Sequence, residues 1–453
     1  MSIYLNTNKP LINYMNLYRS KYFVDKSLMI EKLNEVIETS DKYICITRPR
    51  RFGKSSVIDM LGSYYSIAVD SKDIFDNLKI SNYPSYSEHL NKYNVINISF
   101  NDLSERGNTY EDYIEMIRAS ITKDIVEKYP HINPENYFNI SSMIRDTNDK
   151  FIFLLDEWDY IFNNSLFEEN QNNFLEFLRN LLKDQPYVAL CYMTGVLPIK
   201  KYSSGSALNM FDEFTFLKDR KFGRYFGFTE EEVIDLCKKN NEIKFEHLQA
   251  WYNGYLTARG LKIYNPRSVV KALQNDFCES YWTNTGAMDE VAKYLKYNTL
   301  EIRDDVIEMI SGGEIDLIID EEFRAGQREP KTKEEIYSAM IVLGFLSYHD
   351  GYLKIPNKEL MKEFEKALRD KSFGYVSQII ENSRKMLQAT VSGDTAFIVE
   401  LKKDENVDVA INQIKLKEYV QKFKEENQHK KVLAVAICYN SKEKEHCCKI
   451  EEI

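Results

Sequence analysis

Glycine and proline are scarce in this sequence, with 17 and 10 among 453 residues. That scarcity excludes a collagen-like chain, and the 43% apolar and 29% charged residues exclude an intrinsically disordered one. No internal repeat and no low-complexity linker divides the chain. At this length we expect two or three domains, each with a core of its own.

Long apolar runs and a disulfide framework are also missing. No stretch approaches 18 consecutive apolar residues, so we expect no membrane span. The N-terminus lacks the basic start, apolar core and small-residue cleavage site of a secretory leader. The seven cysteines are scattered, and two lie in apolar, strand-like runs, which is typical of reduced, buried thiols. We therefore expect a cytoplasmic protein.

An excess of positive charge is absent, because the formal net charge is −10. A protein that coats nucleic acid by bulk electrostatics is therefore not favoured, although a local basic groove is compatible with this total. An oligomer is likewise compatible with the sequence, which does not determine the number of subunits.

The first half of the chain alternates short apolar, β-rich runs with segments of helical periodicity. The predicted strands are residues 42–47, 94–100, 151–155 and 187–194. Helical segments separate consecutive strands. Strand, helix and strand repeated in this way predict an α/β fold, with a parallel sheet covered by helices on both faces.

A loop suited to phosphate binding follows the first predicted strand and precedes a helical segment. Backbone N–H groups of such a loop and of the first helical turn point at one place and carry partial positive charge. Gly53 allows close approach of the backbone, Lys54 neutralises the outer phosphates, and the Ser55 hydroxyl ligates magnesium. The general pattern has glycine where Arg48 stands, so the match is incomplete. The predicted nucleotide-binding residues are Arg48, Pro49, Arg50, Arg51, Phe52, Gly53, Lys54, Ser55 and Ser56.

Two acids after the third predicted strand supply the second half of the site. Asp156 can hold the magnesium ion, and Glu157 can polarise the attacking water. Thr194 ends the fourth predicted strand, where a polar side chain senses the γ-phosphate if that strand is central in the sheet. We therefore expect ATP and Mg²⁺ as cofactors, with Glu157, Lys54 and Thr194 as catalytic residues. The alternative is a basic turn and an ordinary acidic strand end.

Hydrolysis also needs an arginine that stabilises negative charge in the transition state. The sequence does not select among the available side chains. The candidates are Arg48, Arg50, Arg51, Arg220 and Arg224.

The pattern changes after about residue 228. Thr229 caps a predicted helix whose first turn is acidic, and the segments that follow are mostly helical. Residues 343–355 resemble the hairpin of a winged helix. Near the C-terminus, predicted strands at 395–401 and 431–439 flank a helix, which indicates a small α/β unit.

Motifs spread over residues 22–360 resemble those of the bacterial and archaeal AAA-ATPase-like family, whose members typically carry a PD-(D/E)XK nuclease-like domain at the C-terminus. The motifs occur in the order of that family. They are YFVDKS (22–27), TRPRRFGKS (47–55), LLDEWD (154–159), TGV (194–196), FGFTEEEV (226–233), WYNGY (251–255), YNPRSV (264–269), YWTNTG (281–286) and LKIPNKEL (353–360).

This resemblance implies a P-loop ATPase domain of the type with an additional strand and a catalytic glutamate (ASCE type). Arginine regularly stands at the position of Arg48 in the family. Lys54, Ser55, Asp156 and Glu157 then keep their ordinary P-loop roles. The resemblance gives recurring positions without a role for four further residues, and the aromatic ones are expected to pack in the core. These four are Asp25, Trp251, Asn265 and Trp282.

The C-terminal unit matches the nuclease pattern only in part. Glu400 and Lys402 have the spacing of the last strand motif, where both side chains lie on one face and hold a divalent metal and a water. Gln413 resembles a residue of the following helix. The second acid of the family is absent, and Asp394 is the only nearby candidate. One interpretation is an active DNase; the other, which we favour, is a shortened remnant that packs as a small α/β domain.

The sequence thus predicts three parts. Residues 1–227 form the ATPase domain, residues 228–370 a helical region with a winged-helix-like element, and residues 371–453 a shortened nuclease-like domain. The expected function is ATP binding and hydrolysis that drives a conformational switch. The alternatives are an ATP-regulated, metal-dependent DNA endonuclease and a nucleotide-dependent switch or scaffold that does not hydrolyse ATP.

Overall fold

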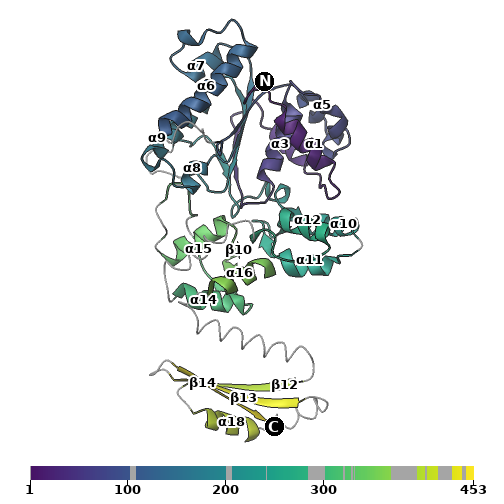
Figure 1. The fold of residues 1–453 in the computed structure, drawn as a ribbon, viewed down its shortest axis with the longest axis vertical. Coiled ribbons are helices and arrows are strands. Elements are labelled where there is room, and N and C mark those ends of the chain that lie inside the picture. The colour runs from purple at the N-terminus through teal and green to yellow at the C-terminus, as the bar shows by residue number, and fades with distance from the viewer. Residues whose placement is uncertain are drawn as a thin grey trace. The chain divides into compact units, whose positions relative to one another are not determined.

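A computed structural model gives the fold in two compact units, residues 1–364 and 365–453 (Figure 1). Each unit is described by itself. The structure describes residues 2–102, 109–199, 207–240, 242–283, 301–319, 322–327, 330, 332–368, 395–403, 406–416, 431–440 and 445–453. Within these ranges no helix is long and apolar enough to cross a membrane.

The first unit is built on a five-stranded sheet in which all neighbouring strands are parallel. The strand order is β2-β3-β4-β1-β5. Every residue of β1, β3 and β4 is buried, as expected for strands covered on both faces. The strands are β1 (Tyr43–Thr47), β2 (Asn94–Ser99), β3 (Phe151–Asp156), β4 (Val188–Gly195) and β5 (Asp212–Phe214). The predicted α/β class is confirmed, and β4 is the additional strand between β1 and β3.

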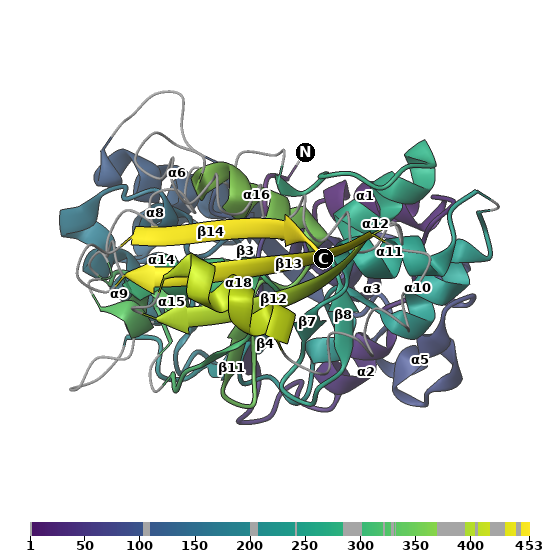
Figure 2. The same ribbon diagram turned by 90° about the horizontal axis from the view of Figure 1, so that it is seen from below.

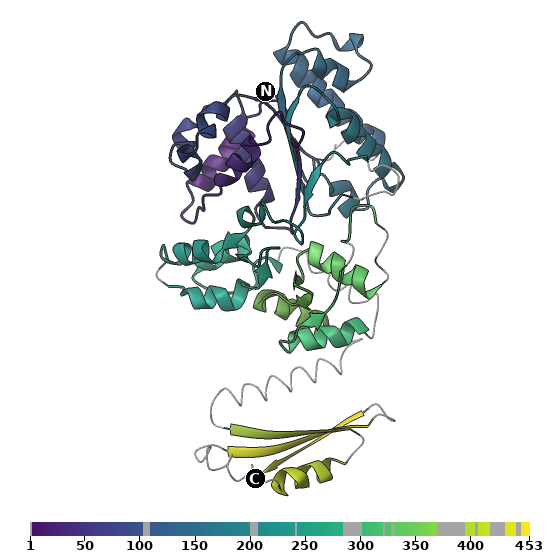
Figure 3. The ribbon, with the colours of Figure 1, turned by 180° about the vertical axis from the view of Figure 1, so that it is seen from behind.

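Alternate residues of β3 enter two different cores, because successive side chains of a strand point to opposite faces. Phe153 packs in a core with α6, α7 and α9, whereas Leu154 packs in a core with α1, α2 and α3. Figure 3 shows these two groups of helices on either side of the sheet. The helices are α1 (Lys9–Tyr18), α2 (Leu28–Asn34), α3 (Lys54–Tyr65), α6 (Tyr110–Lys128), α7 (Ile140–Arg145) and α9 (Gln171–Leu182).

Short helical segments complete the connections of this sheet. They are α4 (Lys72–Phe75), α5 (Ser85–His89), α8 (Tyr160–Asn163) and the 3-10 turns Lys79–Asn82, Pro134–Asn136, Glu168–Asn170 and Gly223–Tyr225. The N-terminal helices α1 and α2 and the edge strand β5 were not predicted from the sequence.

The chain then forms a group of helices with a small antiparallel sheet, of order β6-β8-β7. Thr229 caps α10 as predicted, since its side chain and that of Glu232 bond reciprocally to each other's backbone N–H groups. The small sheet was not predicted, because its strands are only two or three residues long. The elements are β6 (Phe228–Thr229), α10 (Glu230–Cys237), α11 (Phe245–Tyr252), β7 (Tyr255–Leu256), β8 (Lys262–Tyr264) and α12 (Pro266–Asn275).

The predicted hairpin is confirmed further along the chain. Strands β10 and β11 pair antiparallel, and β9 pairs with the outer side of β11. Helices precede and follow this small sheet. The elements are α14 (Glu301–Ile310), β9 (Ile315–Asp316), α15 (Lys333–Val342), β10 (Ser347–His349), β11 (Tyr352–Lys354) and α16 (Lys358–Leu368).

The second unit contains a three-stranded sheet covered on one face by a helix (Figure 2). Strands β12 and β13 are parallel, whereas β13 and β14 are antiparallel. Apolar residues of α18 pack on β12 and β13. The elements are β12 (Thr395–Lys403), α18 (Val407–Leu416), β13 (Lys431–Asn440) and β14 (Glu445–Glu452). The strands at 395–401 and 431–439 are confirmed.

Candidate nucleotide-binding site

The loop between β1 and α3 has the left-handed backbone that a phosphate-binding turn requires. Gly53 has φ +91° and Arg51 has φ +69°. A Cβ on Gly53 would meet no atom within 4 Å, so the backbone angle, not the available space, favours glycine here. The helix α3 begins directly after it at Lys54. The loop therefore leads its N–H groups into a helix N-terminus.

Lys54 is buried and held by the loop that precedes it. Its Nζ donates to the carbonyl oxygens of Arg48 at 2.9 Å and Pro49 at 3.0 Å. Burial lowers the pKa of Lys54 to about 8, while the nearby carboxylates of Asp159, Asp156 and Glu157 act in the opposite direction. The ammonium group thus lies among oxygen atoms at the start of α3.

Asp156, the last residue of β3, lies beside the start of α3. Its Oδ1 accepts from the backbone N–H of Glu157 at 3.0 Å, and the Ser55 hydroxyl lies near enough to lower its pKa. Burial raises the pKa of Asp156, and the Ser55 hydroxyl and the Lys54 ammonium counteract this. The structure therefore brings Lys54, Ser55 and Asp156 together, although about a hundred residues separate them in sequence.

Glu157 follows in a conformation that is uncommon for a residue with a side chain. Its φ is +50°, and its side chain lines a cavity next to the loop. Such backbone angles cost about 1–3 kcal/mol and are frequent at functional sites. Burial, followed by the neighbouring Asp156 carboxylate, raises the pKa of Glu157.

Thr194 lies near the end of β4, between the loop strand β1 and the acid-bearing strand β3. It is fully buried, and its Oγ1 donates to the carbonyl of Ile46 at 2.8 Å. The following Gly195 lines the cavity. A Cβ at Gly195 would come within 2.3 Å of Asp159 Oδ1, so only glycine fits at this point.

Asp159 belongs to the site, although the sequence motifs do not predict it there. Its Oδ2 accepts from the backbone N–H groups of Val196 at 2.9 Å and Leu197 at 2.6 Å, and from the Asn163 side chain at 2.6 Å. The carboxylate thus fixes the chain after β4 to the chain after β3. The signal was present as the third acid of LLDEWD, but no spacing rule gives its partners.

Arg48 takes a different place from the one predicted. Its guanidinium is buried and pairs with Asp219, donates to the carbonyls of Thr47 at 2.7 Å and Phe214 at 2.9 Å, and lies 4.8 Å from the centre of the Phe226 ring. This side chain therefore ties β1 to β5 and the segment beyond it. Only the carbonyl of Arg48 contacts Lys54.

The other candidate arginines differ in their relation to the cavity. Arg50 and Arg51 line it, as do the loop residues Phe52 to Ser56. Within the described ranges, Arg220 and Arg224 are not among the residues that line it. The Arg224 carbonyl instead accepts a hydrogen bond from Lys26 at 2.9 Å.

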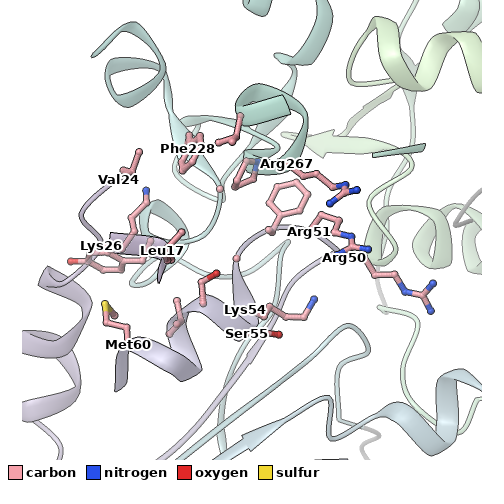
Figure 4. Close-up of a pocket in the computed structure, with 18 of the residues that line it drawn as sticks. Leu17, Val24, Lys26, Arg50, Arg51, Lys54, Ser55, Met60, Phe228 and Arg267 are labelled. Carbon is pink, nitrogen blue, oxygen red and sulfur yellow. The ribbon is translucent and has the colours of Figure 1, made fainter. Parts of the chain in front are cut away.

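The cavity has a volume of about 890 Å³ and two chemically different ends (Figure 4). Lys54, Arg50 and Arg51 lie toward one end, together with Arg267 of α12. Leu17, Val24, Met60 and Phe228 lie toward the other end. Lys26 lies there too, and its ammonium group pairs with Glu232 at 2.6 Å. The walls come from the loop, the N-terminal segment and α12, so parts of the chain far apart in sequence enclose one space.

The four recurring residues without an assigned role have structural surroundings. Asp25 accepts from the backbone N–H groups of Ser27 and Lys79, both at 2.8 Å. Asn265 caps α12. Trp282 is buried and stacks on Phe345, and the Trp251 ring lies beneath the ammonium groups of Lys358 and Lys362. This is the packing role expected for the aromatic members.

In the second unit, the structure describes part of the predicted nuclease remnant. Glu400 and Lys402 lie on one face of β12, with 3.8 Å between Oε1 and Nζ. Gln413 lies on α18, the helix that packs on this sheet. Asp394 lies outside the described residues. Among the residues described, no three His, Cys, Asp or Glu side chains form a cluster for a metal ion.

The strand order, the loop between β1 and α3 and the acids after β3 together define a P-loop nucleotide-binding fold. Residues 12–204, which contain β1 to β4, the loop and the acids, match the family model AAA-ATPase_like, described as "Predicted AAA-ATPase".

A curated protein and a solved structure are among the proteins similar to the chain. The "Uncharacterized protein in vnfD 5'region" of Azotobacter chroococcum mcd 1 is 26% identical over 280 residues, which cover 58% of this chain and 51% of that protein. The chain therefore matches about half the length of this relative. Among solved structures, the Walker-type ATPase paby2304 of Pyrococcus abyssi is 14% identical with a TM-score of 0.38, over 75% of this chain and 94% of that one.

Proposed function

We propose that this protein binds ATP with Mg²⁺ and hydrolyses it. The observation that supports this most directly is the convergence of Lys54, Ser55 and Asp156 beside a loop that leads into a helix N-terminus. A buried ammonium, a hydroxyl and a carboxylate at this place are the groups that a metal–triphosphate complex needs. The matched family model covers all three residues.

Each group has a distinct part in binding. The N–H groups around Gly53 and the Lys54 ammonium would contact the phosphates, in place of the carbonyls that Lys54 now contacts. The hydroxyl of Ser55 and the carboxylate of Asp156 are hard oxygen donors that lie near each other, so they fit Mg²⁺. When bound, Mg²⁺ neutralises phosphate charge.

Glu157 is the group proposed to accept a proton from the attacking water. It lines the cavity directly beside Asp156, so the water would lie between Glu157 and the terminal phosphate. Thr194 lies on the central strand at the same edge of the sheet. Its hydroxyl, now bonded to Ile46, is the proposed sensor of that phosphate.

The shape of the cavity supports a nucleotide over a bare phosphate ion. The cationic end would hold the triphosphate, and the apolar end, with Leu17, Val24 and Phe228, would hold the base. A volume of about 890 Å³ lies within the range of sites that bind small organic ligands.

The loop also has a direct mechanical connection to the helical region, as a conformational switch requires. Phe52 packs edge-on against Tyr255, with ring centroids 5.2 Å apart. Pro49 lies so close to Gly344 that a Cβ there would come within 2.6 Å of Pro49 Cβ. The Tyr255 hydroxyl donates to the Gly344 carbonyl at 2.7 Å. Movement of the loop on phosphate release would therefore displace these contacts.

Phosphate release by wild type, Lys54→Ala and Glu157→Gln tests this function. We expect both substitutions to abolish hydrolysis, while Glu157→Gln still binds ATP because the loop is intact. The matched control is Lys72→Ala, since Lys72 is an exposed lysine of the same unit. Unchanged hydrolysis in Lys54→Ala would refute the proposal. Tight ATP binding by wild type without any phosphate release would support the non-hydrolysing switch instead.

A further inference from the structure

Arg267 enters the cavity from α12, more than two hundred residues after the loop. It is the second residue of this helix, after Pro266. Asn265 fixes the first turn, because its side chain accepts from the N–H of Ser268 at 3.2 Å. Arg267 is thus presented to the cavity by a capped and well-defined helix start.

The guanidinium of Arg267 has an unsatisfied hydrogen-bond donor. Its Nε is buried and has no hydrogen-bond partner. Leaving a buried donor unpaired costs about 1–3 kcal/mol, so such a group calls for an explanation. Two other arginines of the unit show the usual solution, since Arg48 pairs with Asp219 and Arg324 pairs with Glu213 at 2.7 Å.

Arg267 also lies beside a second cation. Figure 4 shows the guanidinium groups of Arg267 and Arg51 next to each other, on the side of the cavity where Lys54 and Arg50 lie. The charge of Arg267 is, after burial, the largest influence that lowers the pKa of Arg51. Like charges so placed repel each other unless an anion lies between them.

The position of this pair identifies which part of a nucleotide it would meet. Glu157 lines the same cavity as Arg51 and Arg267. Its carboxylate acts on the pKa of Arg51 in the opposite direction to Arg267, so it lies within electrostatic reach of Arg51. Glu157 is the proposed base for the water that attacks the terminal phosphate. An anion between Arg51 and Arg267 would therefore be that phosphate.

We propose that Arg51 and Arg267 together bind the terminal phosphate of the nucleotide, so that α12 distinguishes a triphosphate from a diphosphate. This inference rests on the proposed function. A planar guanidinium suits a phosphate because it offers parallel N–H donors. Arg267 completes its hydrogen bonds only in the triphosphate state.

The residue after Arg267, Ser268, connects this end of α12 to other helices of the unit. The Ser268 hydroxyl donates to Glu359 of α16 at 2.7 Å, and both side chains are buried. Glu359 also accepts from the backbone N–H of Trp282 at 2.6 Å. Loss of the terminal phosphate frees Arg267 and with it the α12 end that holds this network.

Calorimetric titration with ADP and with a non-hydrolysable ATP analogue tests the inference. Arg267→Ala is expected to weaken binding of the analogue about ten- to hundredfold while changing ADP affinity less than about twofold. Arg267→Lys keeps the charge but lacks the planar donors, so its affinity for the analogue should lie between those of wild type and Arg267→Ala. The matched control, Arg259→Ala, removes an exposed arginine from a turn and should match wild type.

The outcomes separate the two levels of the proposal. Equal losses of analogue and ADP affinity in Arg267→Ala, or no loss of either, would overturn the role of Arg267 while nucleotide binding stands. Failure of wild type to bind either nucleotide would overturn the proposed function itself. Should Arg267→Ala not fold by circular dichroism, Arg51→Ala and Arg267→Lys carry the same comparison.

Discussion

Two carboxylates near the loop, Asp156 and Asp159, have different roles. Asp156 faces Ser55 and Lys54, where it is available to a metal. Asp159, three residues later, is turned to the backbone of Val196 and Leu197 and holds the end of β4 in place. The spacing of acids in LLDEWD does not tell these duties apart, because the difference arises from which strand end lies opposite each side chain.

The anchoring duty of Asp159 gives a prediction at this scale. Asp159→Ala should lower the free energy of unfolding by about 2–5 kcal/mol, because two buried backbone N–H groups lose their acceptor. Asp159→Asn keeps one acceptor oxygen and should lower the free energy of unfolding clearly less than Asp159→Ala does. Chemical denaturation of both variants measures the difference. Equal stability of Asp159→Ala and wild type would show that the carboxylate anchors nothing.

At the scale of elements, the central strands could be predicted and the edge of the sheet could not. β1, β3 and β4 are nearly continuous apolar runs because helices cover both faces. The predicted bounds of β1 to β4 agree with the structure within one residue. The strand β5 has the sequence Asp-Glu-Phe and is partly exposed, so it has no apolar run from which a strand could be predicted. The strands β6 to β8 escape prediction because each has only two or three residues, too few to show a pattern.

Contacts between side chains of different elements could not be predicted from the sequence either. The place of Arg48 in the loop predicts a contact with the nucleotide. The structure instead gives its guanidinium a carboxylate, Asp219, from the segment after β5. Arg267 is the reverse case, since nothing about YNPRSV indicates that the fold brings it to a loop at residues 48–53. Both depend on long-range packing that no local pattern encodes.

The Arg48–Asp219 pair predicts a large effect on stability. Asp219→Ala should cost about 3–5 kcal/mol, because it leaves a buried guanidinium without its counter-charge. Asp212→Ala, at an exposed position of β5, is the matched control and should be nearly neutral. Thermal unfolding of the two variants makes the comparison. A loss no greater for Asp219→Ala than for Asp212→Ala would contradict the structural role given to Arg48.

At the scale of the whole first unit, the site forms only when segments distant in sequence pack together. The loop and Arg267 of α12 supply the cationic end of the cavity, whereas the N-terminal segment closes much of the rest. The chemistry of the loop and acids could be read from sequence, because strand–loop–helix order fixes it. The enclosing walls could not, because they depend on how distant helices pack around the sheet.

The division of the cavity into two ends predicts a selective loss of affinity. Leu17→Glu, at an exposed position of α1 that lines the apolar end, should weaken ATP binding about three- to tenfold. Affinity for inorganic tripolyphosphate, which has no base, should be nearly unchanged. Ile12→Glu, an exposed apolar residue of the same helix away from the cavity, is the control. Parallel losses for both ligands would show that Leu17 does not lie at the base.

Titration calorimetry with ATP in the presence and absence of Mg²⁺ tests the central claim most directly, with wild type, Lys54→Ala and Asp156→Asn compared. We predict saturable binding by wild type that Mg²⁺ strengthens, little or no binding by Lys54→Ala, and binding by Asp156→Asn that Mg²⁺ no longer strengthens. Equal binding by all three proteins, with the same response to Mg²⁺, would place the nucleotide elsewhere and contradict the account.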